Sequence, residues 1–485
     1  MSHMSSADTR RLFIGACFAL IATSVAFATV GAVMLALKRD FVLTNQQVGW
    51  IGGAALWGFA VSQLIFAPVC DTLGMRFLVR LAWFAHLVGT LVMIFATGFW
   101  LLFAGALVIA MGNGLVEAAC NPLVATLYPD DKTVKLNQFH VWFPGGIVLG
   151  GLAAYGLDAA GIGAWQIKLV LILIPTLIYG VLLLRQQFPA TEGVAAGVSV
   201  GETFKAAFTT PFMWVMLIAM AMTASVELGP NRWVPAVLEA GGMPGILVLV
   251  WISGLMAVLR FKAGAVVHRL SPTGVLLASA ALAGLGLLGL YQWGAGAMAF
   301  VAATVFAIGV CYFWPTMLGV VSERVPRSGA LGLGLMGAVG MATVGLVTAP
   351  QMGRIADNFA HDRIPAAEAR TVIGTGARMF EAMQGEDARV AAEVTTSVQR
   401  EFDATGSMPS PATANALRAI IGADPGEGLA DRAAAILGPA DNYGGRVSFL
   451  YLVPVCAVLI LVFGAMYVRD RRSGGYTVRD IGASD

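Results

Sequence analysis

The stretch WLLFAGALVIAMGNGLVEAACNPLVATL, residues 100–127, decides the fold. It is apolar throughout except for a few polar side chains, and its one charged residue is Glu117. A helix of about 20 apolar residues is long enough to cross the hydrocarbon core of a bilayer. The stretch is therefore predicted to be a transmembrane helix that carries an ionisable group inside the membrane.

The rest of the chain repeats this apolar pattern. Apolar residues make up 58% of the 485 residues and charged residues 12%, against about a quarter charged in soluble domains. We predict an all-α integral membrane protein in contact with the lipid bilayer, because helices satisfy their own backbone groups in lipid. Twelve spans are expected, at 12–37, 48–69, 78–97, 100–127, 136–157, 165–185, 211–233, 245–267, 273–292, 296–321, 329–350 and 446–468.

The positive charges predict the orientation of these spans. With the N-terminus inside, fifteen Lys and Arg residues fall in the inside segments and four in the short outside loops. Because Lys and Arg are enriched on the cytoplasmic side, both termini are expected in the cytoplasm of a bacterial-type inner membrane. The net charge of +2 does not favour nucleic acid. The five cysteines have no CxxC spacing and no ATP motif is present, so we expect no metal and no cofactor. The protein is expected to be a monomer.

One polar segment interrupts the pattern between the last two spans. Residues 357–443 are rich in Ala, Glu and Arg, which predicts a helical external insertion acting as a cap or binding a partner. The expected division is a six-helix bundle at 1–185, a cytoplasmic linker at 186–210, a second six-helix bundle at 211–468 that contains the insertion, and a cytoplasmic tail at 469–485.

The ends of the second and eighth spans resemble each other. Asp71 and Arg76 follow the second span, and His268 and Arg269 follow the eighth. The C-terminus of a helix carries partial negative charge, which a nearby Arg stabilises. The repetition predicts two six-helix halves of like orientation, as in transporters built from parallel repeats. These four residues are candidates for gating.

The segment after the second span also resembles a family signature. The pattern G-x-x-x-D-R-x-G-x-R is typical of the major facilitator superfamily, and this chain keeps Asp71, Gly74 and Arg76 while Ala67 and Thr72 stand at two other positions. The resemblance implies a twelve-helix transporter fold in two pseudo-repeats. It also implies that Asp71 and Arg76 form part of a cytoplasmic latch between helices.

A second likeness lies in spans four and five. The runs Gly114-Leu-Val-Glu117-Ala-Ala-Cys-Asn121-Pro122 and Leu136-Asn137-Gln-Phe-His140 resemble the fucose/glucose-type sugar:cation symporter branch of that superfamily. The likeness implies that a small polar solute, a sugar, is carried by alternating access together with H+, or with Na+ in its place.

Glu117 is the first candidate for the coupling site. Asn113, Glu117 and Asn121 are spaced four residues apart and share one helix face. An ionisable residue at the centre of a membrane helix costs about 2.5–3.5 kcal/mol, so it is taken as a functional residue by default. We expect these three residues to bind solute and Glu117 to carry the proton. A protonated Glu117 hydrogen-bonded between helices is the alternative.

A second polar cluster lies in the seventh span. Glu227 and Asn231 are one turn apart and flank Pro230, which interrupts the helix ladder. Glu227 is a second candidate for proton coupling, and Asn231 a candidate for solute binding. Glu227 could instead be the structural partner of Arg232.

The remaining candidates lie in spans five, eight and ten. Arg260 cannot lose its proton, so it pairs with a coupling carboxylate, binds an anionic solute or forms a fixed ion pair. Asn137 and His140 share a face, from which His140 could relay protons or bind a hydroxyl group. Trp314 precedes Pro315 in mid-span and could stack on a sugar ring.

These patterns predict a secondary active transporter and not an enzyme. The leading hypothesis is H+ symport of a sugar. An exporter or exchanger of organic anions or drugs is favoured if Arg260 faces the cavity without a carboxylate beside it. A receptor that binds without transport is the third possibility. The identity of the solute, the coupling ion and the direction of transport are left open.

Overall fold

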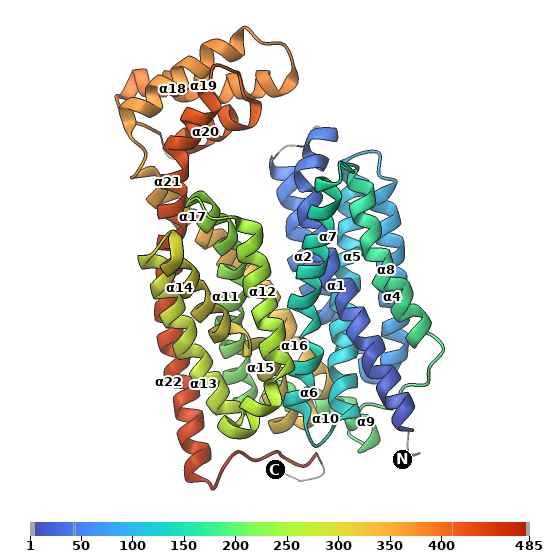
Figure 1. The fold of residues 1–485 in the computed structure, drawn as a ribbon. Helices are drawn as coiled ribbons and strands as arrows, with labels where there is room; N and C mark the ends of the chain where they lie inside the picture. Colours follow the sequence, from blue (N-terminus) through green and yellow to red (C-terminus); the bar gives the residue numbers. More distant parts are fainter. Residues whose placement is uncertain (1–4, 42, 44, 410, 482–485) are drawn as a thin grey trace.

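The computed structural model describes residues 5–41, 43, 45–409 and 411–481. The described residues form helices joined by short turns, which confirms the all-α fold. Two groups of helices stand side by side, with a small helical lobe above one of them (Figure 1). Both termini lie at the end opposite the lobe. We call that end the terminal side, and the end with the lobe the insertion side.

The first group of helices, the N-terminal half, contains eight helices from residue 6 to residue 183. They are α1 (Ser6–Asp40), α2 (Asn45–Phe66), α3 (Cys70–Leu73), α4 (Met75–Ile94), α5 (Phe99–Leu127), α6 (Lys132–Phe139), α7 (Trp142–Ala159) and α8 (Trp165–Leu183). Two short helices, α9 (Glu192–Ala195) and α10 (Val200–Thr209), follow on the terminal side.

The second group, the C-terminal half, is built in the same manner but carries the lobe. Its elements before the lobe are α11 (Pro211–Ala240), α12 (Gly245–Phe261), α13 (Ala263–Gln292), α14 (Gly296–Val310), α15 (Phe313–Arg324), η1 (Pro326–Ser328), α16 (Gly329–Thr343), η2 (Val344–Thr348) and α17 (Ala349–His361). The lobe contains α18 (Ala366–Glu381), α19 (Glu386–Thr405) and α20 (Ala412–Ala423), and α21 (Leu429–Leu450) and α22 (Val453–Arg472) complete the half.

The predicted twelve spans are present in the described chain. Eleven helical segments are long and apolar enough to cross a membrane, and the shorter apolar helix α12 makes the twelfth. Three of the spans consist of two consecutive helices separated by a break. These pairs are α6 with α7, α14 with α15, and α21 with α22. The protein is therefore an integral membrane protein.

The expected end of the eighth span was wrong. Helix α12 ends at Phe261 and not at 267, and the next helix begins at Ala263. Helix α13 has a kink at Ser271, which directly precedes Pro272 and has a φ of 62°. Proline has no N–H and disfavours helical backbone in the preceding residue. His268 consequently lies on a short helical arm before the ninth span.

Packing differs between the interior of each half and the seam between them. Within the halves, α4 packs on α5, α1 on α8, and α13 on both α14 and α22. Across the seam, α6 packs on α15, α2 on α16 and α7 on α12. Glycines bring α2 and α16 close, since a Cβ atom at Gly334 would lie 2.0 Å from Ala67 Cβ. Small residues of this kind permit close approach of membrane helices.

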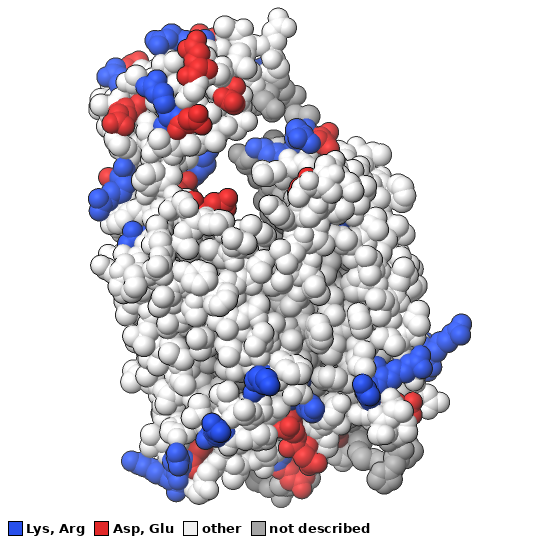
Figure 2. All heavy atoms as spheres, viewed as in Figure 1, with Lys and Arg blue, Asp and Glu red and all other residues white. Residues whose placement is uncertain are grey.

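The lobe has a hydrophobic core of its own. Val372, Ile373, Phe380, Leu417 and Ile420 are buried there, separate from the main core of the bundle. Its surface carries charges of both signs (Figure 2). The lobe occupies the place of the predicted insertion at 357–443, and its external location remains a prediction.

Helix α21 belongs partly to the bundle and not to the lobe alone. The side-chain amide of Asn442 donates hydrogen bonds to the carbonyl oxygens of Val237 and Gly294, at 2.8 and 2.9 Å. Asn442 lies inside the expected limits of the insertion but joins α21 to α11 and to the turn after α13. The C-terminal boundary of the part of the insertion that is independent of the bundle therefore lies nearer to residue 428 than to residue 443.

This boundary can be tested by two deletions of different length. Replacing residues 362–428 with a short Gly-Ser linker should leave the bundle folded, because α17 and α21 still pack together. Extending the deletion to 443 also removes Asn442 and most of α21, and should destabilise the bundle by at least about 2 kcal/mol, at about 1 kcal/mol for each hydrogen bond of Asn442. Thermal unfolding of the two purified variants measures the difference. Equal unfolding temperatures would contradict the assignment of Asn442 to the bundle.

Candidate functional site

A small cavity lies at the centre of the molecule, between the two halves. It has a volume of about 20 Å³, room for about one water molecule. Both halves contribute to its wall, which is formed by Phe59, Glu117, His140, Phe143, Glu227, Leu228, Arg260, Trp314 and Met341. The cavity thus brings together five of the predicted site residues, from α5, the end of α6, α11, α12 and α15.

A break between α14 and α15 shapes one wall of this cavity. Pro315 has no N–H, so the carbonyl of Cys311, four residues earlier, cannot receive the usual helical hydrogen bond. Arg260 Nε donates to that carbonyl oxygen instead. The same break places Trp314 in the first turn of α15, where backbone N–H groups lack helical partners.

A second break, between α6 and α7, repeats this arrangement in the other half. Pro144 follows His140 by four residues and cannot donate to the His140 carbonyl oxygen, which accepts one long backbone hydrogen bond from Phe143 at 3.4 Å. Arg260 Nη1 donates to this oxygen at 3.0 Å. One guanidinium therefore uses two carbonyl groups that prolines have released, one from each half of the protein.

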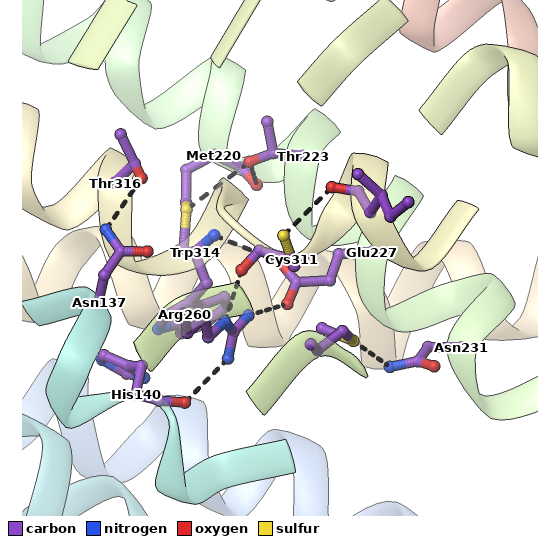
Figure 3. Close-up of polar contacts among 12 residues, drawn as sticks. Asn137, His140, Met220, Thr223, Glu227, Asn231, Arg260, Cys311, Trp314 and Thr316 are labelled. Atoms are coloured by element: carbon purple, nitrogen blue, oxygen red, sulfur yellow. Dashed lines mark hydrogen bonds and ion pairs between the residues drawn. The ribbon is translucent and has the colours of Figure 1, made fainter. Parts of the chain in front are cut away.

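The third partner of Arg260 is a carboxylate. Arg260 Nη2 and Glu227 Oε1 are 2.8 Å apart, and both side chains are buried, with exposed fractions of 2% and 4% (Figure 3). A buried charge is tolerated when it is paired and hydrogen-bonded. Of the alternatives for Glu227, the structure pairs it with Arg260, while Arg232 is exposed. Arg260 in turn has a carboxylate beside it.

Trp314 connects Glu227 to Glu117 of the other half. Its indole Nε1 donates to Glu117 Oε2 at 3.3 Å, and its backbone N–H donates to Glu227 Oε2, also at 3.3 Å. Figure 3 shows Trp314 beside Arg260 and Glu227. A single residue of α15 thus bonds to one carboxylate of each half.

Glu117 has further partners within its own half. Asn121, one turn later on α5, donates through Nδ2 to Glu117 Oε2 at 3.1 Å. His140 Nε2 lies 3.1 Å from Asn121 Oδ1, so this ring nitrogen donates to the amide oxygen. The three side chains are buried and form a continuous hydrogen-bonded chain from His140 to Glu117.

Four predicted solute-binding residues do not line the cavity. Asn121 bonds to Glu117, as described above, and the other three have different partners. Asn113 Oδ1 is 2.9 Å from His86 Nε2, inside the N-terminal half. Asn137 donates to Thr316 Oγ1 across the seam at 3.1 Å. Asn231 Nδ2 lies 3.8 Å from Met256 Sδ.

The predicted gating residues lie on the terminal side. Asp71 Oδ1 accepts a hydrogen bond from Thr191 Oγ1 at 2.7 Å, and its other oxygen lies near Gly329 at the start of α16. His268 Nε2 is 4.0 Å from Asp131 Oδ1. Arg76 is half-buried and its Nε has no hydrogen-bond partner among the described residues, and Arg269 is exposed.

The apolar half of the cavity wall was not predicted from the sequence. Phe59, Phe143, Leu228 and Met341 line it beside the charged groups. Every span is rich in such residues, so no sequence signal separates those at a cavity from those facing lipid. Among the described residues, no group of three or more His, Cys, Asp or Glu side chains could hold a metal ion.

Comparison with known proteins identifies the family. The model of the Major Facilitator Superfamily matches residues 12–365. The chain belongs to this superfamily, as the motif after the second span suggested, and the protein is a membrane transporter and not an enzyme.

Sequence relatives of known function are distant. A gentisate transporter of Corynebacterium glutamicum is 23% identical over 345 residues, which cover 66% of this chain and 75% of the relative. A hexose transporter of Saccharomyces cerevisiae, HXT17, is 29% identical over 209 residues, 40% of this chain and 36% of that protein.

Solved structures share the fold. The Escherichia coli fucose:proton symporter FucP has a TM-score of 0.57 at 18% identity, covering 71% of this chain and 92% of that chain. The proton:xylose symporter XylE has a TM-score of 0.60 at 14% identity, covering 72% and 90%. A bacterial homologue of the lysosomal transporter Spinster has a TM-score of 0.60 at 16% identity, covering 98% and 100%.

The buried ion pair at the cavity leads to a stability prediction. Arg260→Met leaves Glu227 unpaired in the interior and should destabilise the protein by about 3–5 kcal/mol. Adding Glu227→Gln should restore at least half of that loss, because no uncompensated charge remains. The exposed Lys262 offers a matched control, since Lys262→Met should change stability by less than about 0.5 kcal/mol. Unfolding of the wild type, the two single variants Arg260→Met and Glu227→Gln, and the double variant measures the coupling, and purely additive effects would contradict it.

Proposed function

We propose that the protein is a symporter that couples the movement of a small, neutral polar solute, a sugar, to H+ by alternating access. The observation that carries this proposal is the hydrogen-bonded connection between Glu117 and Glu227 through Trp314. Both carboxylates lie at a central cavity, one in each half. Protonation of Glu117 would weaken its acceptor role toward Trp314 and so alter how the halves are held together.

The charge balance of the cavity supports a neutral solute. The charge of Arg260 is neutralised by Glu227, and its guanidinium also donates hydrogen bonds to two carbonyl groups. The guanidinium is therefore not left with an unpaired positive charge that would attract an anionic solute. An anionic solute would have to displace a carboxylate that lies 2.8 Å away. A sugar needs hydroxyl partners and an apolar ring face in place of a countercharge.

The same arrangement favours H+ over Na+. A sodium ion binds through carbonyl and carboxylate oxygens, and three such oxygens near the cavity, those of the Cys311 and His140 carbonyls and Glu227 Oε1, already accept hydrogen bonds from Arg260. Glu117 accepts hydrogen bonds from Asn121 and Trp314, and these donors suit a carboxylate that gains and loses a proton. Glu117 is proposed as the coupling residue, with His140 next to it in the hydrogen-bonded chain.

The solute would bind where the cavity widens. In this structure the cavity is too small for a sugar, so the halves must separate on one side for the solute to enter. His140, Asn121 and Trp314 would then offer hydrogen bonds and an aromatic face to the ring. The side chains of Asn113, Asn137 and Asn231 do not line the cavity and have no hydrogen bond to a described residue that does, and they are proposed to support the helices around it. Both termini are proposed to be cytoplasmic.

The variant Glu117→Gln tests whether Glu117 couples solute movement to H+, because it should affect proton coupling without blocking movement of the solute. Glutamine keeps the size and accepts a hydrogen bond but cannot exchange a proton. Counterflow exchange of the solute should persist within about threefold, whereas accumulation driven by a pH gradient should be lost. Transport in proteoliposomes measures both. The matched control is Glu239→Gln, an exposed glutamate at the end of α11, which should behave as the wild type. Accumulation by the Glu117 variant would remove this residue as the coupling site.

A carboxylate is the second candidate solute, and the gentisate transporter relative favours it. Purified protein should be tested for ligand-induced thermal stabilisation with sugars, sugar acids, nucleosides and gentisate. The neutral sugars are expected to raise the melting temperature, and gentisate is expected to leave it unchanged. Stabilisation by gentisate that Arg260→Met abolishes would reverse the assignment. Flux of the stabilising solute in proteoliposomes distinguishes a transporter from a receptor that binds without translocation.

A further inference from the structure

Glu323, at the end of α15, joins the two halves on the terminal side. It is buried, with an exposed fraction of 5%. Its Oε1 accepts hydrogen bonds from the backbone N–H of Thr133 at 3.0 Å and from the Thr133 hydroxyl at 2.7 Å. Thr133 lies in the first turn of α6, where N–H groups lack partners within the helix and a carboxylate is stabilised. The carboxylate therefore ties the C-terminal half to the N-terminal half.

The backbones of α15 and α6 are also in close contact next to Glu323. One turn before Glu323, a Cβ atom at Gly319 would lie 2.8 Å from the Cα atom of Thr133. No side chain fits there without moving the helices apart. Together with Glu323, this contact closes the seam on the terminal side, and we call the Thr133–Gly319–Glu323 contact the terminal gate.

The tail after α22 returns to the terminal gate. It runs from the end of α22 back across the terminal side (Figure 1). The hydroxyl of Tyr476 donates to Glu323 Oε2 at 2.6 Å, and the backbone N–H of Arg479 donates to the Glu323 carbonyl oxygen at 2.8 Å. Arg327 Nε donates to the carbonyl oxygen of Ile481 at 3.1 Å. The tail is thus hydrogen-bonded to both the side chain and the backbone of Glu323.

The ring of Tyr476 is held as well as its hydroxyl. The guanidinium of Arg324 lies 4.4 Å from the ring centroid, and Arg324 is itself paired with Asp470 at 2.7 Å. Burial, with the adjacent Glu323 carboxylate, raises the pKa of Tyr476 well above its usual value. The phenol therefore stays protonated and continues to donate its hydrogen bond at any pH that the protein meets.

We propose that residues 473–481 form a strap that holds Glu323 in the position where it caps α6, so that the strap controls how readily the terminal side opens. Tyr476 is the positioning residue, because it occupies the one carboxylate oxygen that Thr133 does not use. This inference rests on the alternating-access part of the proposed function. It does not depend on the identity of the solute or of the coupling ion.

A second small cavity, whose lining includes Ser322 next to Glu323 of the terminal gate, provides a reporter site. Its volume is about 20 Å³, and Thr126, Glu192, Ser322 and Leu333 are among the residues of both halves and of the linker that line it. Leu333 is buried, with an exposed fraction of 3%. A cysteine at position 333 should be protected while the gate is closed and should become reactive toward reagents from the terminal side when the gate opens.

The test uses Leu333→Cys in a full-length protein whose five native cysteines are replaced, reconstituted in vesicles of either orientation. Tyr476→Phe removes the hydroxyl and keeps the ring. It should raise the rate of modification by a membrane-impermeant maleimide about tenfold from the terminal side, and leave the rate from the insertion side unchanged or lower. One charge-assisted hydrogen bond accounts for a change of about this size. No solute and no pH gradient are required, so the outcome is independent of the Glu117 experiment.

Three further variants make the result decisive. Tyr467→Phe is the matched control, because the Tyr467 hydroxyl contacts Arg471 on its own helix, and the rate should stay at the wild-type value. Gly319→Val should open the gate directly, and deletion of the tail after residue 473 should reproduce Tyr476→Phe. If Gly319→Val raises the rate while Tyr476→Phe and the deletion do not, the strap has no such role. An equal increase from both sides, or in Tyr467→Phe, would indicate general loosening and also overturn the proposal.

Discussion

The site is organised around Arg260, a buried guanidinium with three oxygen partners. Two of these oxygens belong to the carbonyl groups of His140 and Cys311, which the prolines four residues later release from their helices. The third belongs to Glu227. A permanent charge can remain in the interior only when it is paired and its hydrogen bonds are satisfied. The helix breaks, the ion pair and the position of α12 against both halves therefore depend on one another.

This arrangement also explains why the candidate site is divided between the halves. Helices within a half pack along their length, while the seam is crossed by a few specific contacts at the centre and on the terminal side. At the centre these include Trp314 with Glu117, Arg260 with His140 and Asn137 with Thr316. A change in the charge of Glu117 acts directly on one of them. The fold thus places a titratable group at a contact between two bodies that can move relative to each other.

Much of the site could be proposed from the sequence because ionisable residues are rare within membrane helices. Glu117, Glu227 and Arg260 stood out for that reason, and all three line one cavity. The partners could not be read in the same way. Asn113 shares the helix face of Glu117 by spacing, yet it bonds to His86, because a wide helix face contacts several neighbours. Pairing of Glu227 with Arg260 and not Arg232 depends on how α11 and α12 pack.

The sequence by itself determined the class of protein. Apolar runs of about 20 residues leave a chain no stable arrangement except helices that span a bilayer, and the spacing of the runs sets their number. Tertiary structure alone decided which side chains meet at the cavity, that the end of α21 belongs to the bundle, and that the tail reaches Glu323. These contacts join residues from 33 to 205 positions apart, and local periodicity carries no information about such pairings.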